Sequence, residues 1–236
     1  MAKPSTRQAK TKHPAMSDAA SKAAPGAVPQ AAASAIPARA RKAAARREAI
    51  LSAALDEFSA RGFAAARLDD VAVRAGVAKG TIYLYFADKE ALFQDIVRTM
   101  IVPVVAVVEV TPPPDVPIRA VLENLIDVFV REVYGTRRGD VIRLMMNEGP
   151  RFPALAEFYY KNVVERALTA MRGLLQRAMA KGELKDERLL QFPQLLVTPV
   201  IFAIVWRGLF DRFAPVDVAA LMRAHLDFLF GKEPAP

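Results

Sequence analysis

The sequence predicts an all-α fold, and three observations support that prediction. Hydrophobic residues make up 53% of the 236 positions, which is ample for a sizeable core. After about residue 40, apolar side chains recur three and four positions apart, as they do along the buried side of an amphipathic helix. The alternating Val, Ile and Thr runs that mark strands are few.

Composition also restricts the chemistry that the chain can perform. The absence of Cys removes disulfides, thiolate zinc sites and cysteine nucleophiles, and it suits a reducing cytoplasm. The two histidines, His13 and His225, leave little scope for an imidazole cluster. Glu148, Glu157 and Glu165 fit no catalytic carboxylate pair. We therefore expect no catalytic site, no metal and no cofactor, and a helical enzyme is the less economical alternative.

Positive charge is concentrated in an N-terminal arm. The formal net charge is +8, yet residues 1–47 contain ten Lys or Arg and one acidic residue, so the rest of the chain is close to neutral. Residues 1–38 are mainly Ala, Pro, Ser and Lys without apolar periodicity, and we expect them to be disordered. Such an arm suits a polyanion; a solvated tail and a transit peptide are the alternatives.

The first helix is expected to begin near Ala40. Apolar residues from Ile50 to Phe58 form one buried stripe, and Gly62 ends the helix as a C-cap glycine would. Two short helices follow, over Leu68–Ala75 and Lys79–Phe86.

A longer helix is expected after them, with Asp88 as its N-cap. It starts at Lys89 and continues toward Val110, kinked by Pro103, whose ring removes a backbone hydrogen bond. The proline-rich run 111–117 then breaks the pattern, and we place a domain boundary there. The long helix before it is shared between a head, residues 39–98, and a body, residues 99–236.

Five further helices are expected in the body, separated by a rigid corner at 149–153, by Gly182 and by Ala214-Pro215. They cover Ile118–Tyr134, Val141–Glu148, Ala154–Lys181, Glu187–Phe213 and Val216–Phe230. The apolar stretch 189–210 is long enough to suggest a membrane span. Because it contains Pro193, Pro199 and Arg207, we interpret it as a buried interface helix and expect no membrane contact.

The two short helices of the head satisfy the spacing rules of a helix-turn-helix. Ala72 is the small residue where the second helix crosses the first, and Gly76 suits the turn. The crossing is filled by apolar residues: Val71, Ala75, Val77, Ile82 and Phe86.

Helical geometry assigns the faces of the second short helix. Ile82 and Phe86 face the core, whereas Gly80 and Leu84 lie on the far side, where a major groove would be. An exposed leucine at this position has no structural purpose, but it can meet a thymine methyl group. The residues expected to contact DNA are Arg46, Arg47, Arg67, Lys79, Gly80, Thr81, Tyr83, Leu84, Tyr85 and Lys89.

The run from Arg46 to Val97 resembles the N-terminal domain of TetR/AcrR regulators, above all in Ala-Gly-Val-Ala-Lys-Gly-Thr-Ile-Tyr-Leu-Tyr-Phe and Lys-Glu-Ala-Leu. The resemblance implies that Thr81, Tyr83 and Lys89 contact DNA. The family usually has Thr or Ser where this chain has Ala66, so a helix cap worth about 1 kcal/mol is missing there. The phosphate contact of that hydroxyl passes to Arg67.

The body suggests a dimer and a ligand pocket. The last helix is apolar round most of its circumference, and the resemblance implies that helices 187–213 and 216–230 form a homodimer, with His225 as a satisfied interface residue. An effector pocket is expected from Met145, Met146, Phe152, Phe158, Tyr159, Phe202 and Trp206. Residues 147–153 weakly resemble AefR-type members.

These features together predict a sequence-specific transcription regulator. We expect a homodimeric repressor that binds a palindromic double-stranded operator and is released by a small apolar or amphipathic effector. An activator, or a DNA binder that no ligand regulates, is the alternative.

Overall fold

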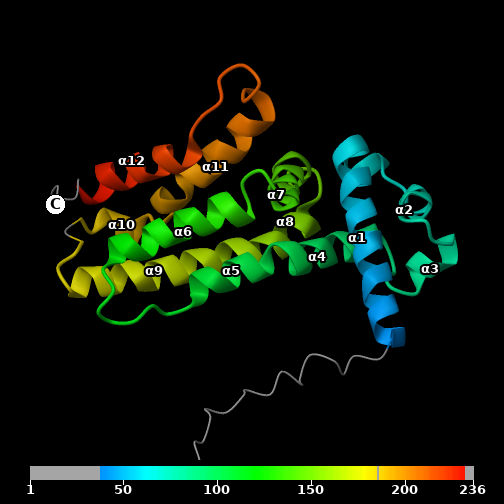
Figure 1. Cartoon of the computed structure of the whole chain (residues 1–236), viewed down its shortest axis with the longest axis horizontal. Coiled ribbons are helices and arrows are strands. Elements are labelled where there is room, and N and C mark those ends of the chain that lie inside the picture. The colour runs from blue at the N-terminus through cyan, green and yellow to red at the C-terminus, as the bar shows by residue number, and fades with distance from the viewer. Residues whose placement is uncertain (1–37, 185, 232–236) are drawn as a thin grey trace, which may run out of the picture.

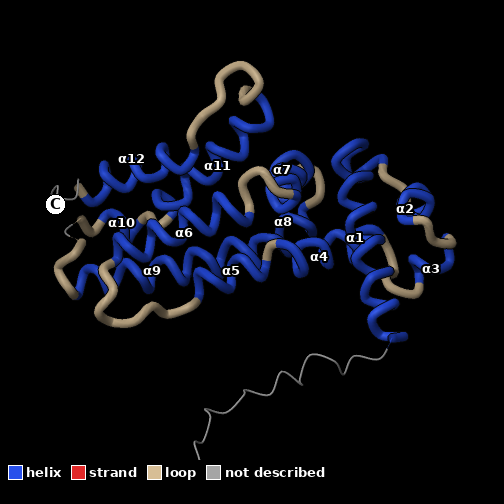
Figure 2. Tube along the Cα trace, viewed as in Figure 1, coloured by secondary structure: helices blue, strands red, loops and turns tan. Residues whose placement is uncertain are grey.

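The structure is a computed structural model that describes residues 38–184 and 186–231. Throughout these residues the ordered elements are helices, and no strand occurs among them, which confirms the all-α expectation (Figure 2). The disordered arm expected at residues 1–38 lies outside the described residues, except for Ala38.

The head lies at one end of the molecule and the long helices of the body extend away from it (Figure 1). It consists of α1 (Ala38–Ala65), α2 (Leu68–Ala75) and α3 (Lys79–Tyr83). Gly62 has φ 76° and interrupts the helical geometry of α1, but helical structure resumes as far as Ala65. The predicted end at Gly62 is therefore a kink near the end of the helix.

The helix that leads from the head into the body is divided in two. α4 (Lys89–Met100) and α5 (Val102–Glu109) meet at Ile101 with a bend of 40°. Asp88 caps α4 as expected, its side chain accepting a hydrogen bond from the amide of Ala91 at 2.7 Å. Pro103 stands in the first turn of α5, where its missing N–H costs nothing, rather than inside one continuous helix.

The body begins with α6 and ends with α12. Its helices are α6 (Ile118–Glu132), α7 (Arg137–Glu148), α8 (Pro153–Tyr159), α9 (Glu165–Ala180), α10 (Arg188–Gln191), α11 (Gln194–Leu209) and α12 (Val218–Phe230). α7 starts four residues earlier than the predicted Val141, because the Thr136 hydroxyl accepts from the amide of Arg138 and caps it. The predicted helix 187–213 is broken at Phe192, ahead of Pro193.

One wide turn joins α8 to α9. Residues Tyr160–Val164 form a single π-helical turn, so the predicted continuous helix 154–181 contains one change of helical type. The side-chain amide of Asn162 donates to the carbonyl of Phe158 at 2.8 Å and satisfies an acceptor near this turn. Such turns often occur beside functional sites.

The buried side chains form two clusters. The first joins the head to α7 and α8, and within it the ring of Phe63 lies 4.8 Å from that of Phe152. The second fills the body between α6, α9, α11 and α12. The core of the head thus continues into two helices that come far later in the chain.

Among the described helices, none is by itself both long and apolar enough to cross a membrane, although the bent pair α4–α5 passes on length and composition.

Candidate DNA-binding surface and effector cavity

The two faces of α3 are separated as the sequence predicts. Ile82 is 0% exposed and Phe86 is buried, whereas Leu84 is 82% exposed and Tyr83 is also exposed. The helix is shorter than expected, because it ends at Tyr83 and Phe86 follows in a turn whose amide bonds to the carbonyl of Ile82. Leu84 thus points away from the core, although the neighbouring Ile82 and Phe86 are buried in it.

The turn between α2 and α3 has the geometry that a helix-turn-helix requires. Gly76 adopts φ 65° and ψ 33°, and the amide of Val77 bonds to the carbonyl of Ala72 at 3.0 Å. Ala72 is itself 2% exposed, so a larger side chain would not fit at the crossing. A side chain added at Gly80 would meet nothing within 4 Å, so this glycine leaves open space in front of α3 for a close partner.

The start of α2 corrects one detail of the sequence interpretation. Arg67, not Ala66, holds the N-cap position, and its side chain makes no capping hydrogen bond. Ala66 is buried in the core of the head. The cap is missing as expected, but one residue later, and Asp69 and Asp70 in the first turn place favourable negative charge at this helix end.

Most basic residues of the head already have acidic or carbonyl partners. Lys79 bonds to Asp69 at 2.8 Å, which raises the pKa of the lysine, and Arg47 pairs with Asp95. The ammonium group of Lys89 donates to the carbonyls of residues 63 and 64, both at 2.8 Å, and so caps the end of α1. Tyr85 is half-buried against the core. If the charged residues among these also contact a DNA phosphate, they must do so with a group that already makes an ion pair or hydrogen bond within the fold.

Two of the basic residues expected to contact DNA have no ion-pair partner in the described part of the chain. Arg46 and Arg67 are exposed, and neither makes an ion pair with any other residue that the structure describes. Thr81 is half-exposed on the flank of α3. The contact residues expected from the sequence are distributed over the head, with Arg46 in the first third of α1 and Arg67 beyond its C-terminal end, and their roles in DNA binding stay predictions.

The body contains an apolar cavity of about 270 Å³. Of the seven residues expected to line a pocket, Met145, Met146 and Tyr159 border this cavity. Burial raises the pKa of the Tyr159 hydroxyl, which therefore remains neutral at pH 7. The rest of the wall is almost entirely aliphatic and comes from α5, α6, α7, the π-helical turn, α9, α11 and the bend at Ile101.

The other four residues lie elsewhere. Phe152 packs in the core of the head against Phe63, and Phe158 lies beneath the guanidinium of Arg98, 4.8 Å from its ring centroid. Phe202 and Trp206 belong to a row of rings along α11 that continues to Phe210, each neighbour 5.2 Å from the next. The aliphatic wall residues, such as Val104 and Val200, were missed because in sequence they cannot be told from ordinary core.

A second cavity of about 170 Å³ adjoins the first, and Val104, Phe129 and Val200 border both. His225 lies at this second cavity, with its Nε2 2.8 Å from the carbonyl of Leu195. The histidine predicted to be satisfied at an interface thus has a backbone partner within the chain. The paired cavities form one apolar region between α5, α6 and α11.

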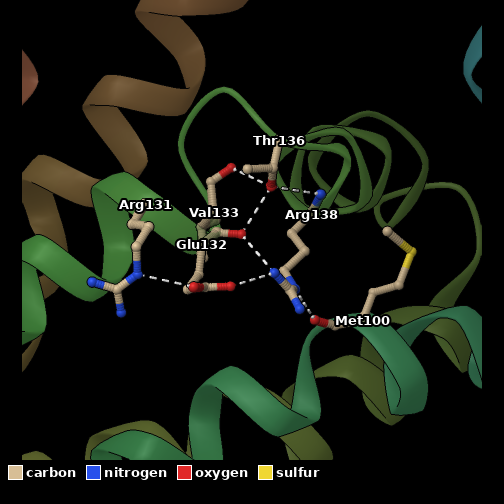
Figure 3. A network of polar contacts seen from close by, with 6 residues as sticks. All are labelled: Met100, Arg131, Glu132, Val133, Thr136 and Arg138. Carbon is tan, nitrogen blue, oxygen red and sulfur yellow. Dashed lines mark hydrogen bonds and ion pairs between the residues drawn. The ribbon is translucent and has the colours of Figure 1, made fainter.

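A polar brace connects the wall of the cavity with the end of α4 (Figure 3). The guanidinium of Arg138 donates to the carbonyl of Met100 at 2.9 Å, to the carbonyl of Glu132 at 3.0 Å and to its carboxylate at 2.9 Å. Arg131 also bonds to that carboxylate, and these two arginines lower the pKa of Glu132. The brace therefore fixes the last turn of α4, just before the bend, to the junction of α6 and α7.

A helix-turn-helix head with an outward-facing short helix, attached to a helical body with an apolar cavity, defines a DNA-binding regulator. Comparison with known proteins specifies the class. The family model described as bacterial regulatory proteins, tetR family, matches residues 50–96, and that of the Tetracyclin repressor-like C-terminal domain matches residues 112–227.

Individual relatives agree. The uncharacterized HTH-type transcriptional regulator YdeS of Bacillus subtilis (strain 168) is 27% identical over 164 residues, which span 68% of this chain and 79% of YdeS. The HTH-type transcriptional regulator RutR of Escherichia coli (strain K12) is 46% identical over 63 residues, but these are 27% of this chain and 30% of RutR. The chain belongs to the TetR family and is a DNA-binding transcription regulator.

Solved structures share the fold along most of the chain. A putative fatty acid metabolism regulator of Clostridium perfringens aligns with a TM-score of 0.62 at 18% identity, covering 79% of this chain and 100% of that one. The regulator FadR of Bacillus subtilis in complex with stearoyl-CoA aligns with a TM-score of 0.59 at 22% identity, covering 79% and 99%.

Proposed function

We propose that this protein is a homodimeric repressor that binds a palindromic operator through α3 and leaves it when a small apolar or amphipathic effector enters the body. Its role is to bind rather than to catalyse, and its place of action is the cytoplasm. The observation that carries the proposal is the apolar cavity, because its wall includes Ile101 at the bend between head and body.

Dimer formation is supported by the surface of α11 and α12. Phe202, Leu209, Phe210 and Phe228 are exposed large apolar residues on or directly after these two helices. Exposed apolar groups gathered in this way mark an interface. A two-fold axis through the two helices would present two copies of α3 to successive major grooves of a symmetric site.

The nature of the effector follows from the wall. Aliphatic side chains surround both cavities, and the hydroxyl of Tyr159 and the ring of His225 are the polar exceptions at their margins. A ligand with an unbranched or cyclic hydrocarbon part fits such a surface. The FadR structure with stearoyl-CoA shows that a protein of the same fold accepts an acyl ligand.

Release from DNA requires that the effector bind one head spacing more tightly than the other. A ligand that enlarges the cavity presses on Ile101 and on the residues of α7 that line it. Arg138 then carries a shift of α7 to the end of α4, since its guanidinium holds the carbonyl of Met100. We propose this brace as the link between cavity and head.

The test is a gel-shift assay on DNA from upstream of the gene of this protein, with and without acyl compounds of graded chain length. We expect binding to a palindromic site, weakened by chains that fit the cavity. The matched control is Leu168→Glu on α9, outside the proposed dimer surface, which places a charge on the cavity wall and should remove the ligand effect but keep DNA binding. Failure to bind any palindrome would contradict the proposal, and binding that no compound changes would favour a DNA binder without ligand control.

The basic arm is proposed to add phosphate contacts. The head from 48 to 95 has more acidic than basic residues, so the ten basic residues among positions 1–47 offset an unfavourable field. Deleting residues 1–38 should lower DNA affinity and flatten its dependence on salt. An unchanged salt slope would show that the arm makes no such contact.

A further inference from the structure

A polar cleft separates the head from the body on the side of α1 and α7, away from the apolar cavity. It has a volume of about 610 Å³ and is bordered by Ser59 and Gly62 on α1 and by Arg143, Asn147 and Glu148 on α7. None of these residues borders the apolar cavity, so the two spaces are distinct.

A buried carboxylate without a partner lies in this cleft. Glu148 is 9% exposed, and its Oε2 is buried without a hydrogen-bond partner among the described residues. Buried carboxylates in proteins are normally paired or hydrogen-bonded, because the loss of hydration is otherwise uncompensated. The partner of Glu148 is therefore missing from the described part of the chain.

The fold keeps space for this carboxylate at Gly62. A Cβ at position 62 would lie 2.8 Å from Oε1 of Glu148, closer than side chains tolerate. The same glycine has φ 76°, a conformation that other residues rarely adopt. Both requirements favour glycine, so the kink in α1 forms a cradle against which the carboxylate rests.

The other charges of the cleft are neutralised within the fold. Arg143 pairs with Asp140, and Arg61 pairs with Glu57 at 3.0 Å and with Asp70 at 2.9 Å. The negative charge of Glu148 is left over. A metal ion does not suit the site, since no group of three or more potential metal ligands gathers among the described residues.

We propose that the cleft between α1 and α7 binds a small organic monocation with N–H donors, an amine or an amidine, through the carboxylate of Glu148. Such a group balances the negative charge and supplies N–H donors to the carboxylate, which turns to bring the enclosed Oε2 to the cleft. The hydroxyl of Ser59 and the amide of Asn147 stand at the same cleft as further polar partners. Because one wall belongs to the head and the other to α7, an occupant would tie the two together and give a second input to DNA binding.

Isothermal titration of the full-length protein with benzamidinium chloride tests the proposal, with benzamide as the neutral isostere and sodium chloride at equal ionic strength as the blank. We expect saturable binding of benzamidinium alone. Glu148→Gln keeps the shape and removes the charge, so it should weaken binding by about thirtyfold or more. Circular dichroism checks that this variant is folded.

Glu157→Gln is the matched control, since that glutamate on α8 is exposed and paired with Lys161 of the π-helical turn. It should bind benzamidinium like the unmodified protein. Absence of binding to the unmodified protein, equal binding by Glu148→Gln, or equal binding of benzamide would each overturn the proposal.

Discussion

The head and the body bury their apolar residues in different ways. In the head, side chains such as Ile50, Phe58, Phe63 and Ile82 are buried at 0–1% exposure. In the body, the helices surround two cavities and leave several large apolar residues of α11 and α12 in solvent. Close packing holds α3 in one orientation, whereas incomplete packing leaves room for a ligand and surface for a second copy.

The contrast shows where each function is specified. The exposed face of α3, the candidate DNA-binding surface, depends on residues that are close together in sequence, from Ala72 on α2 to Phe86 after α3. The cavity depends on six α-helices, α5 to α9 and α11, which come together only in the folded chain. Substitutions that test packing should therefore act differently in the two regions.

The largest effect is expected at the centre of the head. Ile82→Ala should reduce the free energy of unfolding by about 2–5 kcal/mol, because it leaves a void beneath α3 that the sealed core cannot fill. Urea denaturation followed by circular dichroism measures the loss. A loss below about 1 kcal/mol would mean that the core of the head is as loosely packed as the body.

A pair of enlarging substitutions tests the comparison directly. Ala72→Leu forces extra atoms into the crossing of α2 and α3 and should cost about 1–3 kcal/mol. Ala167→Leu, on the wall shared by the two cavities, extends into open space and should cost less than about 1 kcal/mol. Thermal melting of both variants supplies the measurement, and equal costs would remove the distinction between the regions.

On the exposed face of α3, a substitution should change DNA affinity without changing the free energy of unfolding. Leu84→Ala removes a side chain that is 82% exposed, so stability should change by no more than about 0.5 kcal/mol. DNA affinity should fall by about tenfold, since apolar contact with a base is lost. Fluorescence anisotropy on the operator measures this, with Val73→Ala, equally exposed on α2, as a matched variant that should leave affinity unchanged.

A small local effect is expected at the start of α4. Asp88→Ala removes the acceptor of the Ala91 amide and should lower stability by about 1 kcal/mol. Asp88→Asn retains an acceptor and should recover most of the loss. If both variants melt like the unmodified protein, the cap contributes nothing to the junction of head and body.

Much of the head could be predicted from the sequence. The bounds of α2, the turn at Gly76, the cap at Asp88 and the buried side of α3 follow from short-range rules of helix geometry and capping. The early start of α7 was missed, although Thr136 has the hydroxyl of an N-cap, because polar residues 137–140 hid the apolar periodicity.

The candidate sites were harder to predict. Aromatic and methionine residues were expected at the pocket. However, Phe152 packs in the core of the head, and Phe202 belongs to the row of aromatic rings along α11. Aliphatic residues that line a cavity have the same spacing as those that fill a core, so sequence cannot separate them. Nor could it show Glu148 as an unpaired carboxylate, which depends on the approach of α7 to the kink at Gly62.

In the proposed repressor dimer, the bend at Ile101 is the pivot of a lever. α4 has 12 residues and so spans about 18 Å at 1.5 Å per residue. A change of about 10° at the pivot moves its far end by about 3 Å, and two heads related by a two-fold axis change their separation by up to about 6 Å. Successive major-groove faces lie about 34–36 Å apart. In the proposed dimer, an angular change too small to disturb any single helix is thus enough to decide whether both heads fit a palindromic operator at once.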